Sequence, residues 1–271
     1  MDIPASPFTI GSLPANAPDR ARRPVGTVAA SMPAPDPDEA PSREEYSATA
    51  SDPYVPAPRS ESLSRLFNFV VAASIFLITL PLMVLTAIAI KLTSRGPVIY
   101  SQTRVGVDRR WNRTRAMHDR RGEDTGGTQF TIYKFRSMRV DAEKDGKAVW
   151  AKKDDDRCTP VGRFIRKVRL DELPQLWNVM RGDMNMVGPR PERPSIVLRL
   201  REEIENYGVR QRVKPGLTGY AQIYHSYDTD IEGVRIKLSY DLRYLQEQSM
   251  WTDLRILVNT IPVVLGRKGG W

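Results

Sequence analysis

The chain has very few of the residues that build disulfides and histidine metal sites. It contains 1 cysteine, Cys158, and 2 histidines, His118 and His225, among 271 residues. A single cysteine excludes an internal disulfide. With no histidine placed to activate it, Cys158 is expected to be a packed small residue rather than a nucleophile. The sequence also lacks a Gly-x4-Gly-Lys-Ser/Thr loop, which argues against a P-loop nucleotide hydrolase.

The first 62 residues lack the apolar periodicity of a folded segment. They are rich in Ala, Ser and Asp, and 12 of the 21 prolines fall within residues 1–60. Such a segment cannot bury enough apolar surface to offset its chain entropy, so a disordered Pro-rich tail is predicted for residues 1–62. No basic start followed by an apolar run is present, so no signal peptide is predicted.

The charge is uneven along the chain. Residues 1–60 carry 5 basic and 8 acidic side chains, about −3, whereas the whole chain carries +9. The remainder is therefore more basic than the whole chain, at about +12. A domain of this charge is expected to meet anionic partners, such as phosphates, nucleotides or a lipid surface.

Residues 66–90 lack any charged side chain. A helix rising about 1.5 Å per residue over this length could cross a hydrocarbon core of roughly 30 Å. We predict a membrane helix over residues 63–92; the alternative is a buried helix of a soluble core. Pro81 can kink it, and Ser74 and Thr79 can meet the freed backbone groups. The basic residues that follow place its C-terminal side in the cytoplasm, but charge alone does not decide whether it crosses or turns back.

Asp171 and Glu172 are adjacent carboxylates in a segment dense with arginine and lysine. Nearby cations and the start of a following helix favour ionised carboxylates. An ionised carboxylate among arginines can attack phosphorus or hold a divalent metal beside a phosphate. A surface turn whose charges form salt bridges is the competing interpretation.

The helix that follows these carboxylates is predicted from the proline at its start and the glycine at its end. Pro174 suits a first helical turn and pushes the preceding Leu173 away from helical angles. The helix should run to about Met180, and Gly182 can end it.

This region resembles the signature of the bacterial sugar transferases, the monotopic phosphoglycosyl transferases that start polysaccharide and glycoconjugate assembly. The shared pattern reads T-x-x-G-R-x-x-R, L-D-E-L-P-Q-L-x-N-V, R-G-D-M and V-G-P-R-P, and it occurs here between residues 159 and 191. Further matches at residues 94–106, 130–138 and 240–265 extend the resemblance from about residue 63 to the C-terminus. The match at 212–223 is partial, because Arg212 lies nearer Pro215 than the family's arginine does and Tyr220 replaces the usual Trp.

The resemblance implies an α/β membrane-associated fold. Residues 63–92 would form a re-entrant membrane helix with both ends in the cytoplasm. Residues 93–271 would form a compact, mainly helical catalytic domain with a small sheet and interfacial helices. The expected location is the bacterial inner membrane, with the catalytic domain on its cytoplasmic face and in contact with membrane lipids.

The resemblance also implies a reaction. Sugar-1-phosphate would pass from a UDP-sugar to polyprenyl phosphate, such as undecaprenyl phosphate, with release of UMP. Asp171 would attack the β-phosphorus, and Glu172 would hold Mg²⁺. The remaining predicted site residues bind substrate: Lys134 and Arg136 from one face of a strand, Arg166 on phosphate oxygens, and Arg190 with Pro191 at the uridine nucleotide.

Two other functions compete with this one: a non-catalytic membrane scaffold of a polysaccharide assembly complex, and a membrane-tethered nucleic-acid binder. The basic charge alone suggests the second, and no nucleic acid is expected as a partner because no motif for it is present. A homodimer is compatible with the resemblance. The sugar is not determined by the sequence.

Several polar and apolar segments have local interpretations. The Arg-rich stretch 107–129 is predicted to be a loop that faces the membrane. The acidic runs 154–156 and 228–230 are interpreted as solvated loops. Pro215, Gly216 and Gly219 predict a tight turn. Near the C-terminus one helical stripe would lie in the lipid interface or in the core: Met250, Leu254, Leu257, Val258 and Ile261.

Overall fold

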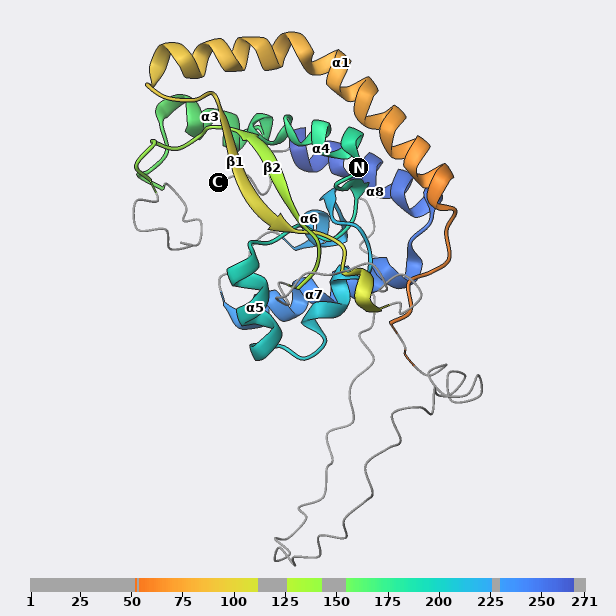
Figure 1. Cartoon of the computed structure of the whole chain (residues 1–271). Helices are drawn as coiled ribbons and strands as arrows, with labels where there is room; N and C mark the ends of the chain where they lie inside the picture. The colour runs from red at the N-terminus through yellow and green to blue at the C-terminus, as the bar shows by residue number, and fades with distance from the viewer. Residues whose placement is uncertain (1–51, 53, 112–125, 143–154, 226–229, 266–271) are drawn as a thin grey trace, which may run out of the picture. The chain divides into compact units, whose positions relative to one another are not determined.

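The computed structural model describes residues 52, 54–111, 126–142, 155–225 and 230–265, and the predicted mainly helical fold with a small sheet is confirmed in them (Figure 1). Most of the predicted tail, residues 1–51, lies outside the described residues, as does most of the Arg-rich stretch. The elements in chain order are α1 Glu61–Thr93, β1 Ile99–Val105, η2 Arg109–Trp111, β2 Gln129–Phe135, α3 Pro160–Lys167, η3 Leu170–Glu172, α4 Gln175–Arg181, β3 Asn185–Val187, α5 Pro194–Glu203, η4 Tyr207–Arg212, β4 Gly216–Thr218, α6 Tyr220–Tyr224, α7 Ile231–Glu247 and α8 Met250–Leu265.

The strands form two small pairs. β1 and β2 are antiparallel, with Tyr100 opposite Lys134, and β3 pairs in parallel with β4. The prediction of a tight turn around Gly216 was wrong, because this residue begins β4. A Cβ at Gly216 would lie 2.0 Å from the backbone nitrogen of Gly188, so only glycine permits this approach of the two strands.

The main core lies where α1, α4, α7, α8 and β3 meet. Burying these apolar side chains together is the main favourable term in forming the fold. The cluster therefore ties the segment that leads to the predicted carboxylates to the C-terminal helices. Its fully buried members include Leu176, Val179, Val187, Leu245 and Ile256.

Helix α1 is longer than predicted and continuous through Pro81. Figure 1 shows it changing direction part-way along its length. Pro81 lacks the N–H that would donate to the carbonyl oxygen of Leu77 four residues earlier. The hydroxyl of Thr79 donates 2.7 Å to the carbonyl oxygen of Ile75 instead, so it does not take the role predicted for it. The helix is long and apolar enough to cross a membrane by length and composition.

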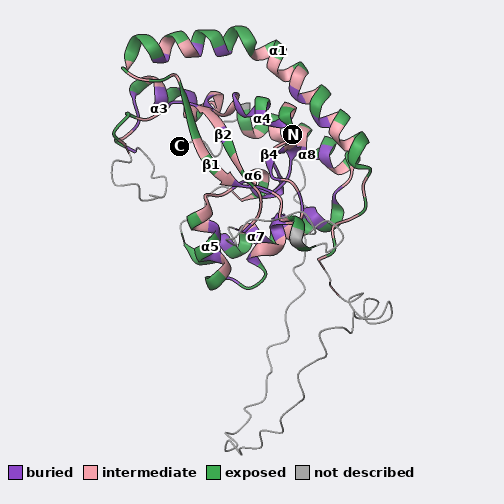
Figure 2. Cartoon of the chain, viewed as in Figure 1, coloured by how far each residue is buried: buried purple, intermediate pink, exposed green. Residues whose placement is uncertain are grey.

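The two halves of α1 pack on different parts of the same domain. In the first half Ala72 belongs to the main core with Leu176, and in the second half Met83 and Ile90 pack with a cluster that contains Ile165. The opposite face stays exposed, as the green segments of α1 in Figure 2 show. Large apolar side chains on that face include Leu77, Ile78, Leu85 and Leu92. A soluble-core helix would bury both faces, so the exposed face argues against that alternative.

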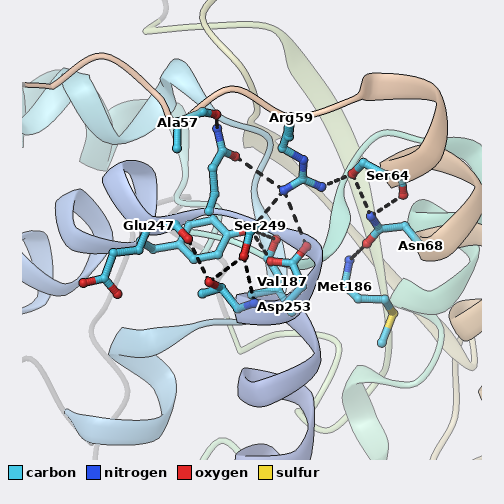
Figure 3. A network of polar contacts seen from close by, with 12 residues as sticks. Ala57, Arg59, Ser64, Asn68, Met186, Val187, Glu247, Ser249 and Asp253 are labelled. Carbon is cyan, nitrogen blue, oxygen red and sulfur yellow. Dashed lines mark hydrogen bonds and ion pairs between the residues drawn. The ribbon is translucent and has the colours of Figure 1, made fainter.

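The segment just before α1 is ordered, although the sequence predicted disorder through residue 62. The Ala57 nitrogen donates 3.0 Å to the Leu245 carbonyl oxygen, and Ser60 caps α1. Figure 3 shows Arg59 reaching α7 and α8, where it lies 3.5 Å from Asp253. Specific contacts to α7, rather than local composition, hold this segment in place.

A hydrogen-bond chain continues from Arg59 to strand β3. Arg59 donates to the hydroxyl of Ser64. Asn68 donates 2.7 Å to the Ser64 carbonyl oxygen and accepts 2.6 Å from the Met186 nitrogen (Figure 3). We call Arg59, Ser64, Asn68, Tyr244 and Asp253 the junction cluster. It fastens the start of α1 to β3 and to the α7–α8 corner.

Some local predictions need correction. Asp155 is buried and forms an ion pair with Arg157, so it is not a solvated loop residue. Asp230 is exposed, as predicted, and also caps α7 by accepting from the Gly233 nitrogen. Asp154, Asp228 and Thr229 lie outside the described residues. The sequence left the C-terminal stripe open between the core and the lipid interface. Met250, Leu254, Val258 and Ile261 are exposed and lie outside the core, whereas Leu257 packs against it.

Candidate active site

The predicted carboxylates lie in a short turn between α3 and α4. Arg169, in the left-handed region at φ 60°, reverses the chain after α3 and starts the turn. Leu173 adopts αR angles, so the prediction that Pro174 would exclude them was wrong: the following helix continues the turn almost without a break. Gly182 ends α4 at φ 89°, as predicted.

Glu172 is surrounded by cations from two other segments and from the start of its own turn. Its Oε1 accepts 2.8 Å from Lys134 of β2 and also accepts from Arg190, and its Oε2 lies 3.9 Å from Arg169. Burial alone would raise the pKa of Glu172, but the charges of Arg190, Lys134 and Arg169 outweigh burial and hold the pKa well below its usual range. Glu172 is therefore a firmly ionised carboxylate.

Asp171 has the opposite electrostatics. Its side chain is 8% exposed. Burial, together with the negative charge of Glu172, raises the pKa of Asp171 to about 6, although Lys134, Arg166 and Arg169 act to lower it. The expectation that the site would simply favour the ionised form thus holds for Glu172 and not for Asp171. A carboxylate that is costly to ionise but still ionised at neutral pH is suited to nucleophilic attack.

Arg190 connects the carboxylates to a second ion pair, formed by Arg210 and Asp241. Its guanidinium reaches Glu172, and its own carbonyl oxygen accepts 2.8 Å from Arg210 of η4. Arg210 is buried and ion-paired at 2.7 Å with Asp241 of α7. The attraction of Glu172 raises the pKa of Arg190, so Arg190 is a permanent cation.

Sequence reasoning missed Arg210. The family pattern R-x-x-x-x-P-G has four residues between its arginine and its proline, whereas only two separate Arg212 from Pro215. Counting back from Pro215 and Gly216 shows that Arg210 has the family spacing. Arg212 instead pairs with Asp52 at 2.6 Å, at the start of the described chain.

A second ion cluster beside Arg190 was also missed. Glu192 accepts 2.8 Å from Lys237 and lies 3.5 Å from Arg104. Burial would raise the pKa of Glu192, but Lys237, Arg104 and Arg210 together lower it to about 2. Arg104 also donates 3.1 Å to the Pro191 carbonyl oxygen, so both cations fix the predicted nucleotide-binding turn. Nothing local in the sequence connects residues 104, 192 and 237.

The other predicted phosphate-binding cations lie in different places. Arg166 is near enough to Asp171 to influence its pKa, and its guanidinium donates 3.1 Å to the buried Cys158 sulfur. Cys158 is therefore packed, as predicted. Arg136 follows β2 and donates to the carbonyl oxygens of Ser94 (3.0 Å) and Arg95 (2.7 Å) just after α1. The structure brings Lys134, Arg166 and Arg190 to the carboxylates, whereas the contacts of Arg136 are with the end of α1.

Asn178 explains how β2 delivers Lys134 to Glu172. This fully buried residue of α4 accepts 3.1 Å from the Tyr133 nitrogen and donates 2.7 Å to the Thr131 carbonyl oxygen. It also donates 3.0 Å to Asp183. Because the Asn178 side chain pairs with one N–H and one carbonyl group of β2, it fixes the position of the strand relative to α4. The motif contained this asparagine, but the sequence gave no reason to assign it this role.

A divalent metal would find only a partial set of ligands here. Among the described residues there is no group of three or more His, Cys, Asp or Glu side chains placed to hold one. The adjacent carboxylates of Asp171 and Glu172 still fit Mg²⁺, which commonly takes one or two protein carboxylates and completes its shell with phosphate oxygens and water. Such a metal therefore fits this site only together with a phosphate-bearing substrate.

Comparison with known proteins identifies the family of this chain. The family model for bacterial sugar transferases matches residues 59–267. The chain belongs to the bacterial sugar transferase family. The matched range contains the carboxylates and the ion clusters described above, from Arg104 to Asp241.

Individual relatives in this family differ in the sugar they are named for. The chain is 39% identical over 211 residues to the UDP-N-acetylgalactosamine-undecaprenyl-phosphate N-acetylgalactosaminephosphotransferase of Aeromonas hydrophila, covering 78% of this chain and 45% of that protein. It is 38% identical over 204 residues to the UDP-glucose:undecaprenyl-phosphate glucose-1-phosphate transferase of Caulobacter vibrioides, covering 74% and 69%. It is 35% identical over 226 residues to the UDP-galactose-lipid carrier transferase of Erwinia amylovora, covering 78% and 42%.

The chain thus spans less than half the length of the Aeromonas and Erwinia proteins. All three names include a UDP-sugar and a lipid acceptor, but each names a different sugar.

Proposed function

We propose that this chain transfers sugar-1-phosphate from a UDP-sugar to a polyprenyl phosphate and releases UMP. The observation that carries the proposal is the pair of carboxylates with opposite pKa shifts, Asp171 and Glu172, set among Lys134, Arg166 and Arg190. Membership of the sugar transferase family and the names of the relatives support the same reaction.

The reaction would proceed in two displacements. An Asp171 carboxylate oxygen attacks the β-phosphorus of the donor, and the bond from that phosphorus to the bridging oxygen breaks, so UMP leaves with both electrons. A phosphate oxygen of the lipid then attacks the aspartyl-phosphosugar. The bond between phosphorus and Asp171 breaks, which regenerates the carboxylate and leaves the sugar on a lipid diphosphate.

The cations around Glu172 would stabilise the donor. Lys134 and Arg190 now neutralise Glu172, and we propose that they move to the incoming diphosphate oxygens, where negative charge develops. Arg166 would serve the same phosphates from the α3 side. When bound, Mg²⁺ supplies further neutralisation of the diphosphate. Glu172, freed from its two cations, would hold it.

Attachment to a membrane would place this site near its lipid acceptor. We propose that α1 is re-entrant, because both of its halves pack on the same domain and its outer face is apolar and exposed. The exposed stripe of α8, with Trp251 76% exposed, would lie in the lipid interface. A site held at headgroup depth meets the acceptor phosphate without extracting the lipid. Location at the cytoplasmic face of the bacterial inner membrane stays a prediction, as does the formation of a homodimer.

The direct test uses the detergent-solubilised full chain with polyprenyl phosphate, Mg²⁺ and a panel of UDP-sugars. UMP release that depends on the lipid and on one sugar would establish the reaction and identify the donor. Absence of UMP with every sugar in the panel would contradict the proposal and favour the membrane scaffold.

A further inference from the structure

We propose that Arg136 is a positioning residue, which fastens Lys134 to the end of α1 so that the Lys134 ammonium meets Glu172. This inference rests on the proposed function, because Lys134 is one of the cations assigned to the donor's phosphates. It differs from the phosphate binding that the resemblance implies for Arg136. The observation behind it is a buried guanidinium whose hydrogen bonds, in the described part of the chain, go to the segment between α1 and β1.

Arg136 holds that segment at three residues. The residue is 5% exposed, and its guanidinium donates 2.7 Å to the carbonyl oxygen of Arg95. It also donates 3.0 Å to the carbonyl oxygen of Ser94 and 2.6 Å to the hydroxyl of Ser94. The Arg136 backbone nitrogen donates 2.8 Å to the carbonyl oxygen of Val98. No carboxylate among the described residues pairs with this cation; carbonyl oxygens at the negative end of the α1 dipole take that place.

The turn after α1 encloses the guanidinium tightly. Gly96 has φ 115°, in the left-handed region that favours glycine. A Cβ at this position would lie 2.2 Å from Nη1 of Arg136. The backbone and the guanidinium therefore fit each other closely, and the guanidinium has one place in this fold.

The residue between Lys134 and Arg136 is also attached to α1. Phe135 is 4% exposed and belongs to the cluster that contains Met83 and Ile90 from the second half of α1. Residues two apart in an extended chain are separated by about 7 Å. The end of β2 thus reaches α1 through one apolar and one polar contact, both within two residues of Lys134.

The other side of Lys134 is fixed by α4. Asn178 accepts from the Tyr133 nitrogen and donates to the Thr131 carbonyl oxygen. Lys134 therefore lies between two anchored segments, and its Nζ donates 2.8 Å to Glu172. Removing the Arg136 contacts would release one of the two anchors, so the place of this cation depends on how the end of α1 sits on the domain.

The test measures how fast a trace of acetic anhydride acetylates Lys134 in the purified full chain, read by mass spectrometry and without turnover. Lys237 is a matched internal control, because it also lies 2.8 Å from a glutamate and the two lysine side chains are 18% and 15% exposed. In Arg136→Met, acetylation of Lys134 should rise about 10-fold or more while that of Lys237 stays unchanged. Unchanged acetylation of Lys134, or an equal rise at both lysines, would overturn the inference.

Milder variants keep the test valid where Arg136→Met does not fold. Ser94→Ala removes one acceptor from the α1 side and leaves the cation with its two carbonyl contacts, so acetylation of Lys134 should rise about 2- to 5-fold. Arg136→Lys keeps the charge and should give a smaller rise than Arg136→Met. Arg139→Met, at an exposed position, should give none. Wild-type acetylation of Lys134 in Ser94→Ala would contradict the proposed attachment.

A double-variant cycle in the transfer assay separates positioning from direct contact with phosphate. Arg136→Met alone should lower kcat for UMP release about 10-fold or more. Because Arg136 acts through Lys134, adding Arg136→Met to Lys134→Met should cost little further activity. Losses that simply multiply would show that Arg136 acts on the substrate itself. Failure of the wild-type chain to release UMP, with the acetylation change still present, would reject the transfer reaction but retain the coupling of Arg136 to Lys134.

Discussion

Asp171 and Glu172 are neighbours in the chain, yet the fold shifts their pKa values in opposite directions. Glu172 touches Lys134 and Arg190 directly, so its negative charge is compensated. Asp171 is buried beside that same negative charge and has the pKa raised to about 6. Paired carboxylates with separated pKa values are a recurrent way to give one of two similar groups a distinct chemical role.

At this scale we predict that Asp171→Asn abolishes transfer but stabilises the fold at neutral pH. Because the native state holds the Asp171 proton more tightly than the unfolded chain, ionising Asp171 costs stability above about pH 6. The asparagine variant avoids that cost, worth at most about 3 kcal/mol. Its Tm should exceed that of the wild type at pH 8, and the difference should shrink as pH falls from about 6 toward 4. Appreciable residual transfer by this variant would exclude the covalent route.

A second prediction concerns the pH dependence of the first displacement. Attack requires ionised Asp171, so the burst of UMP formed without lipid acceptor should decline as pH falls through about 6. Leaving out the lipid matters, because a phosphate monoester also titrates near pH 6. Glu172 stays ionised over this range, since the pKa of Glu172 is held well below its usual range. A burst rate that is flat between pH 5 and 8 would mean that Asp171 is not the titrating nucleophile.

At the scale of elements, the site is built by contacts between segments that are distant in the chain. Asn178 pins α4 to β2, and Arg210 pins η4 to the Arg190 turn and to α7. The junction cluster does the same for the start of α1. It reaches the site because the Tyr244 hydroxyl donates to Asp253 (2.7 Å) and also lies 3.1 Å from the Val187 carbonyl oxygen, just before the Arg190 turn.

We therefore predict that Arg59→Met destabilises the protein by about 3 kcal/mol, because it leaves Asp253 buried without its cation. Replacing Asp253 by Asn in the same chain should recover part of this loss, since the uncompensated charge is gone. Thermal unfolding of the two single variants and the double variant measures the coupling. Strictly additive losses would show that Arg59 and Asp253 do not interact.

At the scale of the whole molecule, the arrangement of α1 bears on the proposal that the chain is held at a membrane. Its halves contact two clusters on one domain, so a perpendicular crossing would pull one half away from its packing partners. The exposed residues of α1 and α8 are the apolar surfaces that this arrangement leaves uncovered.

This arrangement predicts that both ends of α1 lie on the same side of the membrane. Cysteines introduced as Glu61→Cys and Leu92→Cys, in a chain whose buried Cys158 is replaced by Ser, should react alike with a membrane-impermeant maleimide in intact vesicles. Both residues are exposed in the structure, so their accessibility depends on the membrane. Labelling of only one of them before detergent is added would indicate a spanning helix.

The sequence by itself determined the local features of this protein. The apolar run of α1, the helix end at Gly182 and the strand around Lys134 follow from composition, backbone preference and alternation over a few residues. The motif also identified the carboxylates and most of their cations. Such features depend on near neighbours in the chain, so a pattern of residues is enough to predict them.

Tertiary structure decided what these residues face. It joined Arg104, Glu192 and Lys237 into one cluster and turned Arg136 toward the end of α1. It also separated the pKa values of two adjacent carboxylates. Burial and Coulomb interaction act through space between segments far apart in the chain, and no local pattern records those distances.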